Sequence, residues 1–428
     1  MAQLKKEITL ASGIGLLSTT LLGTGLFMVP ALAAGIAGPL SLWSWLLLLL
    51  GICPIALTFA QLGKRYPNAG GTAFFVRQAF NRRLEKSIAW LFLSVIPVGV
   101  PAAIALAAGF LQPLLPAALD NALVAQSITV VLLVLVNLSG TKSSGQLQTA
   151  IAISIFALVA TLWWFGDISQ PDIAMPKVTY SDWTLIGSAL AVMFWCFVGI
   201  EAFAHMGEEF KNPQRDFPIA ILVGCLVAGA AYWACSVVVI KYHAYGSSEF
   251  DTGSIPYLAQ LLFSDTVKPW INVIGFVACF ASINLYTQSL ARMVWAQARE
   301  YAPSHRLANL STNGVPANAT LSVGAVLLLS CFISYLTQLD LEFFVKLANG
   351  VFILVYLMAM LAAVKLLHGF AKGLAVIALL TCAFMLAFLG WSMLYAVGLF
   401  ALLMYKIKPD TKQQNEAQAK ALDHITNG

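Results

Sequence analysis

The sequence is most deficient in charged residues. Only 10% of its 428 residues are Asp, Glu, Lys or Arg, whereas 60% are hydrophobic. Soluble domains carry about 25% charged residues, so this composition excludes a soluble globular protein. No stretch of the chain is polar enough and long enough to form a separate soluble domain.

Residue patterns for metal binding and nucleophilic catalysis are also lacking. No HExxH or GxSxG motif is present, and the five histidines are scattered along the chain. The seven cysteines lie inside apolar runs without metal-ligand spacing, so we interpret them as small hydrophobic side chains rather than a disulfide framework. We therefore expect no metal and no cofactor. A membrane-embedded enzyme is the disfavoured alternative.

Long apolar runs are what the chain has in abundance. A helix needs roughly 20 apolar residues to cross a bilayer, and such runs recur along the whole sequence. They begin near Thr9, Ser41, Leu84, Ala122, Gln146, Trp183, Phe217, Trp270, Pro316, Phe343, Leu374 and Trp391. The sequence thus predicts an all-α polytopic membrane protein with 12 transmembrane helices.

The distribution of positive charge predicts the orientation of these spans. If the N-terminus is cytoplasmic, all but four of the 24 Lys and Arg residues lie on the cytoplasmic side, as the positive-inside rule requires. The exceptions are Lys177, Lys241, Lys268 and Lys346. Both termini are then cytoplasmic, including a polar tail over 407–428. The net charge of +5 indicates a basic face toward membrane lipids, not nucleic acid.

Two predicted spans contain glycines near their middle. The first reads TTLLGTGLFMVP, with Gly23-Thr24-Gly25, and the sixth reads FWCFVGIEAF, with Gly199 beside Glu201. The two spans run in opposite directions because they are five apart, which is the arrangement of an inverted repeat. Glycine-interrupted segments at corresponding positions of two such halves indicate a transporter's central site. The alternative is that the glycines let neighbouring helices pack closely.

Breaks of this kind suit an amino acid, which is a zwitterion. N–H groups at the start of a half-helix can bind a carboxylate, and free carbonyls can bind an ammonium group. In the first span we expect the donors to be the N–H groups of Thr24, Gly25 and Leu26. In the sixth span we expect Phe194 and Trp195 to form an apolar lining, with Trp195 as a gate.

Glu201 is an ionisable residue inside an apolar span, and such residues are functional-site hypotheses by default. Three interpretations are open. The side chain is a proton carrier, or an anchor for backbone N–H groups freed by the break, or a partner of His205 one turn further on.

Three motifs resemble those of the amino acid, polyamine and organocation transporter superfamily. They are GIGLLSTTLLGTGLFMVPALAAG in the first span, KRYPNAGGTAFFVRQAF after the second, and FVGIEAFAHMGEEFKNPQRDFPIA across the sixth. WLFLSVIPVGVPAA, VMFWCFVGIEAFAH and ACFASINLY are most similar to bacterial inner-membrane exporters of methionine and branched-chain amino acids.

The resemblance implies a LeuT-like fold with helices 1 and 6 broken. It implies one transporter domain over 1–406, with inverted repeats over 9–166 and 183–367 and two additional helices over 374–405. It also implies a substrate carboxylate at Gly23, Thr24 and Gly25, and a substrate amino group at the carbonyls of Leu21, Trp195 and Val198.

Two further implications concern spans eight and five. Asn284 is implied as polar lining of the substrate site, beside the break at Gly199. Several proton-coupled relatives carry a lysine midway along span five, where this chain has Ile155. Coupling through such a lysine is therefore not expected here, which leaves Glu201 or simple exchange.

We predict a carrier in the cell inner membrane that exports neutral apolar amino acids (methionine, leucine, isoleucine and valine) by alternating access. We expect it to act as a proton antiporter. The alternatives are an amino acid uptake symporter and an amino acid exchanger.

Overall fold

The computed structural model describes residues 8–66, 71–139, 145–169, 172–203, 210–212, 214–247, 249–263, 266–311, 314–337 and 341–407. In these ranges the chain is helical, apart from turns and one isolated bridge between Ile8 and Phe210. The first half contains α1 (Leu10–Ala37), α2 (Ser41–Arg65), α3 (Gly71–Ala79), α4 (Arg82–Leu93), α5 (Gly99–Leu111), α6 (Ala122–Ser139) and α7 (Gly145–Phe165). The second contains α8 (Asp182–Met193), the 3₁₀ turn η4 (Phe194–Phe197), α9 (Ile200–Phe203), α10 (Asp216–Lys241), α11 (Phe250–Leu262), α12 (Lys268–Tyr301), α13 (Ala317–Thr337), α14 (Leu341–Leu366), α15 (Gly369–Phe388) and α16 (Met393–Lys406).

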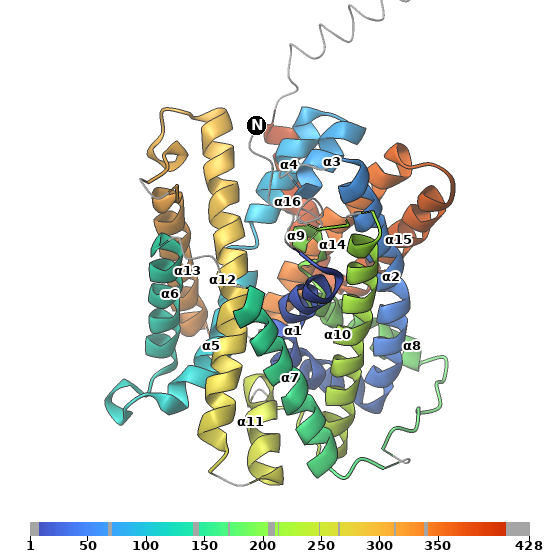
Figure 1. Ribbon diagram of the computed structural model, residues 1–428, viewed down its shortest axis with the longest axis vertical. Helices are drawn as coiled ribbons and strands as arrows, with labels where there is room; N and C mark the ends of the chain where they lie inside the picture. Colours follow the sequence, from blue (N-terminus) through green and yellow to red (C-terminus); the bar gives the residue numbers. More distant parts are fainter. Residues whose placement is uncertain are drawn as a thin grey trace, which may run out of the picture.

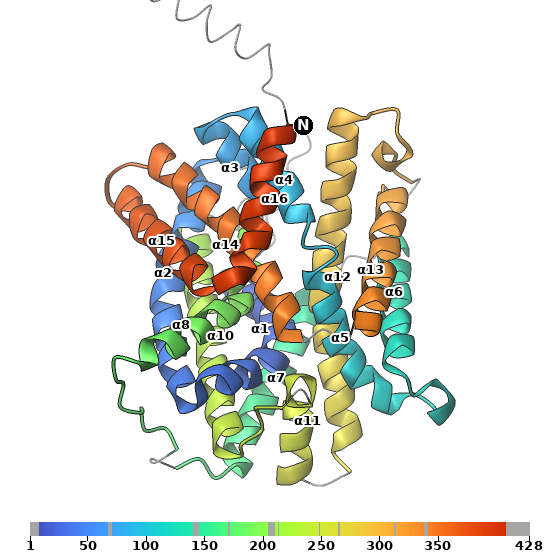
Figure 2. The same cartoon turned by 180° about the vertical axis from the view of Figure 1, so that it is seen from behind.

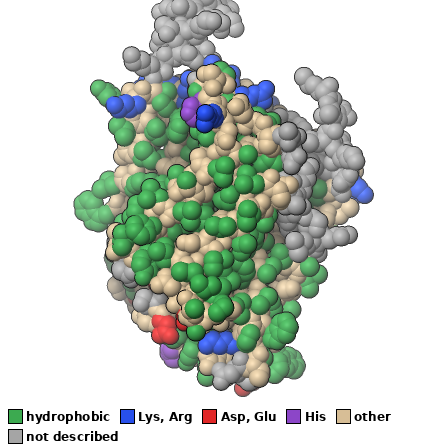
Figure 3. Space-filling view, turned by 90° about the vertical axis from the view of Figure 1, so that its left-hand side faces the viewer, with side chains coloured by type: hydrophobic (Ala, Val, Ile, Leu, Met, Phe, Trp, Pro, Cys, Tyr) green, Lys and Arg blue, Asp and Glu red, His purple; other side chains and the backbone are tan. Residues whose placement is uncertain are grey.

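Many of the described helices have the length and composition of membrane spans. Seven stretches are long and apolar enough to cross a bilayer, the first of them running through both α1 and α2, and four shorter apolar helices accompany them. A broad band of hydrophobic side chains covers the middle of the molecular face in Figure 3, with Lys and Arg toward its ends. The prediction of an all-α polytopic membrane protein is therefore confirmed.

The helices begin close to the positions predicted from the apolar runs. The predicted starts near Thr9, Ser41, Gln146 and Phe217 each lie one residue or less from the start of α1, α2, α7 and α10. The boundary between the last two predicted spans is a real turn, because α15 ends at Phe388 and Gly390 has a φ of 58°. Glycine adopts this left-handed conformation without steric cost and commonly ends helices.

Helix α1 lies at the centre of the bundle (Figure 1) and packs against α7, α8, α10 and α12. Helices α6 and α13 pair on one side, next to α12, while α2, α14 and α15 form the other side. Figure 2 shows the end of α16 close to α3 and α4, at one end of the bundle.

The predicted break in helix 1 is wrong for this structure. Helix α1 is continuous from Leu10 to Ala37 and passes through Gly23, Thr24 and Gly25. In a continuous α-helix each backbone N–H bonds to the carbonyl four residues earlier. The N–H groups of Thr24, Gly25 and Leu26 are therefore engaged inside α1. Glycine costs only about 1 kcal/mol in a helix interior, which is too little to unwind a helix that is packed on all sides.

The glycines of α1 instead permit close approach of neighbouring helices. A Cβ atom built at Gly23 would lie 2.3 Å from the Cβ atom of Ser282 on α12. One built at Gly25 would lie 2.3 Å from the hydroxyl oxygen of Tyr232 on α10. Close packing through small residues is a general way in which membrane helices associate. The packing alternative for span one is thus the one that this structure supports.

The predicted break in helix 6 is confirmed. Helix α8 ends at Met193, η4 follows, Val198 is extended, and Gly199 has a φ of 121° before α9 begins. A φ of this size strongly favours glycine. The predicted pairing of Glu201 with His205 concerns a residue outside the described ranges.

The third predicted span is also interrupted, which the sequence analysis did not anticipate. Helix α4 ends at Leu93 and α5 begins at Gly99, with successive turns between them. Pro97 lies in these turns, and proline has no N–H group to continue a helix. Pro101 lies in the first turn of α5, where proline is tolerated.

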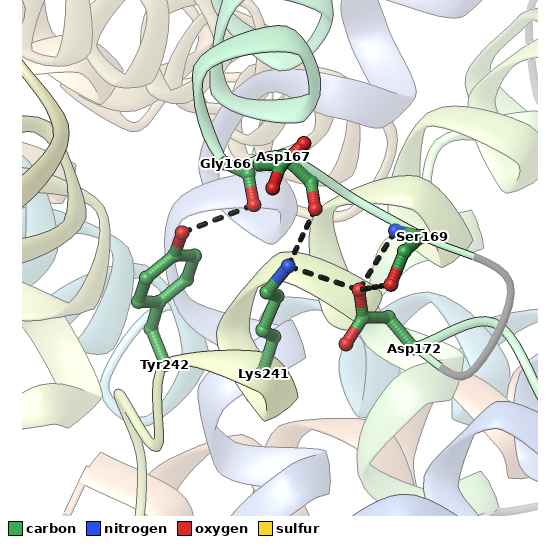
Figure 4. A network of polar contacts seen from close by, with 6 residues as sticks. All are labelled: Gly166, Asp167, Ser169, Asp172, Lys241 and Tyr242. Atoms are coloured by element: carbon green, nitrogen blue, oxygen red, sulfur yellow. Dashed lines mark hydrogen bonds and ion pairs between the residues drawn. The ribbon is translucent and has the colours of Figure 1, made fainter.

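A polar network joins the ends of α7 and α10 (Figure 4). The Lys241 ammonium group donates to the carbonyl of Asp167 at 2.6 Å and to the carboxylate of Asp172 at 2.9 Å. The same carboxylate accepts from the N–H and hydroxyl of Ser169, and Tyr242 donates to the carbonyl of Gly166 at 3.0 Å. The Ser169 N–H and the Lys241 ammonium group lower the pKa of Asp172 from 3.8 to about 2.

Alanine at Gly23 or Gly25 should destabilise the protein by about 1–3 kcal/mol, because the added methyl group overpacks α1 against α12 or α10. The measurement is thermal unfolding in detergent. Gly398→Ala is the matched control, since a Cβ atom there meets nothing within 4 Å; this change should be neutral or stabilising. Wild-type stability in Gly25→Ala would contradict the close packing.

Asp172→Asn should lower the melting temperature more at pH 7 than at pH 3. The folded-state pKa of Asp172 is depressed, so its stabilising effect is complete above about 3.8 and is lost as the pH falls toward 2. Asp182→Asn is the comparison for a carboxylate that bonds only locally, because Asp182 begins α8 and accepts from the N–H and hydroxyl of Thr179 just before it. A difference in melting temperature between Asp172→Asn and wild type that does not change with pH would contradict the lowered folded-state pKa of Asp172.

Candidate functional site

A pocket lies where the interrupted spans three and six meet α1, α12 and α14. Its lining is mostly apolar and contains no charged side chain. The lining residues are Thr20, Leu21, Thr24, Val95, Gly99, Val100, Ala103, Trp195, Val198, Ser282, Ile283, Tyr286 and Phe352. Small-molecule sites typically have this character, with apolar walls and a few polar groups that orient the ligand.

The polar groups of the lining are hydroxyls and one indole N–H. Trp195 donates from Nε1 to the Thr24 hydroxyl at 3.1 Å, so it bridges the broken span and α1. Its ring meets Phe352 edge-on, with ring centroids 6.4 Å apart. Trp195 therefore forms one wall of the pocket and is held from two sides. This position is compatible with its predicted role as a gate, which remains a prediction.

The break in span six exposes backbone groups that side chains from other helices satisfy. Asn349 on α14 is fully buried, and its amide donates to the carbonyls of Ala191 and Val192 at 2.8 and 3.0 Å. The hydroxyl of Tyr356, also on α14, lies 3.3 Å from the carbonyl of Phe197, and its single O–H is shared between this carbonyl and Glu201. An unsatisfied backbone group costs several kcal/mol inside a membrane, so these contacts stabilise the break.

Glu201 accepts hydrogen bonds on both carboxylate oxygens and is 4% exposed. The N–H of Gly199 donates to Oε2 at 2.8 Å, and Tyr356 donates to the same oxygen. Tyr286 on α12 donates to Oε1 at 2.8 Å. The anchor interpretation required a bond to an N–H group freed by the break, and the Gly199 bond has this geometry.

The structure brings only part of the predicted site to the pocket. Leu21, Thr24, Trp195 and Val198 line it. The carbonyl of Leu21 already accepts from the Tyr232 hydroxyl at 2.6 Å.

The other predicted residues lie behind the lining. Gly23, Gly25 and Leu26 are on buried parts of α1 outside the pocket. Phe194 packs edge-on against Tyr356, with centroids 5.2 Å apart. Gly199 lies beside Thr20, whose Cγ2 atom would be 3.1 Å from a Cβ atom built on the glycine.

Asn284 is outside this pocket as well. Its Oδ1 atom accepts from the amide of Asn137 on α6 at 2.8 Å, so it joins two helices. Ile155, the residue in place of the family's lysine, is fully buried in α7.

Several lining residues were missed in the sequence. Val95, Gly99 and Val100 enter the pocket because span three is interrupted, and the proline and glycine pattern VIPVGVP could have indicated this. The partners of the break, Asn349 and Tyr356, lie about 150 residues from it along the chain. A lone asparagine in an apolar span was the only sequence signal for such a partner.

Comparison with known families identifies the class of protein. The family model described as amino acid permease matches residues 8–414, so the chain belongs to the amino acid permease family, within the amino acid, polyamine and organocation superfamily. Members of this family are membrane transporters rather than enzymes.

Relatives of known name agree with this class. The chain is 48% identical to the L-methionine/branched-chain amino acid exporter YjeH of Escherichia coli (strain K12), over 96% of this chain and 99% of the relative. It is 28% identical to the uncharacterized amino acid permease YecA of Bacillus subtilis (strain 168), over 99% and 100% of the two chains. The chain is 27% identical to the serine/threonine exchanger SteT of the same bacterium, over 69% of this chain and 68% of the relative. The chain is thus a multi-pass inner-membrane transporter.

Asn349→Ala should destabilise the protein by about 1–3 kcal/mol, because two buried carbonyls lose their side-chain donor. We expect methionine binding to weaken as well, since the break forms part of the pocket. Unfolding and binding of radiolabelled methionine are the measurements.

The control is Asn318→Ala, which removes a comparable amide bond, to the carbonyl of Arg306, at an exposed site. Water can replace that bond, so the change should stay within about 0.5 kcal/mol. Equal effects of the two substitutions would contradict the role of Asn349 at the break.

Proposed function

We propose that this chain exports neutral apolar amino acids, namely methionine, leucine, isoleucine and valine, across the cytoplasmic membrane by alternating access. The observation that carries the proposal is the uncharged, largely apolar pocket beside the broken span six. Burying a charged side chain there without a partner would cost several kcal/mol, so acidic and basic substrates are disfavoured. The name of the 48% identical relative YjeH points to the same substrates.

The substrate's charged ends require polar partners inside this pocket. The carbonyl of Val198 is suited to the amino group, because the chain is extended there. The carbonyl of Trp195 accepts from the N–H of Val198 at 3.2 Å and has a second lone pair for the amino group. The carboxylate would bind to N–H groups of Thr24, Gly25 and Leu26. These groups lie in the continuous helix α1, so binding them requires α1 to open locally. The Thr24 hydroxyl already faces the pocket.

The proposed topology has 12 spans with both termini cytoplasmic. Two inverted repeats cover 9–166 and 183–367, and two further helices cover 374–405. The agreement between predicted and described helix starts supports this arrangement. In this orientation the network around Lys241 is extracellular and the basic side faces membrane lipids.

Glu201 is the proposed proton carrier, and proton entry would drive export. Its support is burial beside the pocket with hydrogen bonds from two ionisable tyrosines. Ile155 offers no second ionisable group in span five. An amino acid exchanger is the second candidate, favoured by the name of the relative SteT. An uptake symporter would use the same site in the opposite direction.

Purified protein in liposomes should exchange radiolabelled methionine or leucine, and an imposed pH gradient should drive net flux. Glu201→Gln should reduce gradient-driven flux by at least about tenfold while exchange and binding persist, because the amide cannot carry the proton. Lysine and glutamate serve as control substrates and should not be carried.

Each possible failure of this experiment is informative. Absence of methionine and leucine exchange would overturn the substrate class. Unchanged gradient-driven flux in Glu201→Gln would overturn proton coupling and leave the exchanger.

A further inference from the structure

Tyr286 touches both the pocket and the buried carboxylate. It is one of the 13 lining residues, and its hydroxyl donates to Oε1 of Glu201 at 2.8 Å. The hydroxyl also lies 3.9 Å from a Cβ atom built at Gly199, so it is at the break itself. Glu201 is absent from the lining. Tyr286 is thus a direct hydrogen-bonded connection between the substrate pocket and this carboxylate.

We propose that Tyr286 couples substrate binding to the protonation of Glu201, because its hydroxyl orients in opposite ways in the two protonation states. This inference rests on the proposed function. A phenol has one O–H donor, and its oxygen can accept. While Glu201 is ionised, that donor points to Oε1, and the lone pairs of the hydroxyl are available to a substrate ammonium group in the pocket.

Protonation of Glu201 reverses this orientation. A proton taken from water forms an O–H bond on the carboxyl group, which can then donate to the Tyr286 oxygen. The Tyr286 O–H now points into the pocket, toward the place of the ammonium group, and two donors cannot bond to each other. The negative charge of Glu201 is lost at the same time. Substrate and proton therefore compete, as antiport requires.

The groups around Glu201 make Tyr286 the only described connection of this kind. Two ionisable side chains face the carboxylate, Tyr286 from α12 and Tyr356 from α14. Tyr356 packs against Phe59 and Phe194 and is not part of the lining. It contacts Glu201 without contacting the pocket, which makes it a natural control.

The remaining helices packed on α9 bring no further charge to the site. They are α1, α2 and α3, and α1 has no ionisable side chain. Other described charged residues on these helices and on α12 and α14 are exposed or lie near helix ends: Lys64, Arg65, Arg77, Lys268, Arg292, Arg299, Glu342, Lys346 and Lys365. Residues 204–209 lie outside the described ranges.

The test is the pH dependence of methionine affinity, measured by equilibrium binding to purified protein between pH 5 and pH 8. Competition with one proton weakens wild-type affinity as the pH falls, by up to about tenfold per pH unit. Tyr286→Phe keeps the ring but removes the hydroxyl, so its affinity should vary less than about twofold over this range. The methionine affinity of Glu201→Gln should be similarly independent of pH.

Tyr356→Phe is the matched control. It removes a hydrogen bond from the same carboxylate, so the pH at which methionine affinity falls should shift. The loss of affinity at low pH should persist. Melting temperatures show whether each variant is folded. The proposal is overturned if Tyr286→Phe follows the wild-type pH dependence, or if Tyr356→Phe becomes flat as well.

Failure of the proposed function gives a different result. If wild-type protein binds neither methionine nor leucine at any pH, the substrate class is wrong and the inference falls with it. If wild-type protein binds methionine with an affinity that does not change with pH, the inference and the proton coupling through Glu201 are overturned, whereas the substrate class stands.

Discussion

Inside a membrane, a backbone N–H or carbonyl group that leaves a helix finds no water, and the protein must supply its partner. The architecture around Gly199 follows from this constraint. The freed N–H of Gly199 bonds to Glu201, and the carbonyls of Ala191 and Val192 bond to Asn349. Tyr356 shares its one O–H between Glu201 and the carbonyl of Phe197. The break is therefore stable only with α14 beside it, which also fixes one wall of the pocket.

Helix α1 satisfies the same constraint by remaining helical. Its glycines bring Ser282 and Tyr232 against the backbone, and the Tyr232 hydroxyl adds a second donor to the carbonyl of Leu21. A substrate carboxylate that takes N–H groups from α1 must replace the bonds that those groups make within the helix. The two central spans thus contribute differently, since span six is already open and α1 must exchange internal bonds for bonds to a ligand.

The apolar runs predicted the starts of most long helices, because burial in lipid determines them locally, but not the short helices α3 and α11 or the interruption between α4 and α5. The break at Gly199 was also predictable from a local feature, because its φ of 121° strongly favours glycine. Span one contains a similar glycine pattern, but whether the helix breaks there depends on which side chains pack against Gly23 and Gly25. Such contacts join residues more than 200 positions apart and leave no local pattern. The roles of Asn349, Tyr286 and Tyr356 were hidden for this reason.

Glu201 does not line the pocket itself, and this affects which amino acid side chains the pocket accepts. A carboxylate lining the pocket would attract basic side chains, whereas here the lining contains only hydroxyls, an indole N–H and apolar groups. In the proposed arrangement Tyr286 stands between Glu201 and the substrate, so the carboxylate acts on the amino group that every amino acid carries. The side chain then contacts only apolar walls such as Val100 and Phe352. Separating charge from the walls lets one site combine proton coupling with a preference for uncharged side chains.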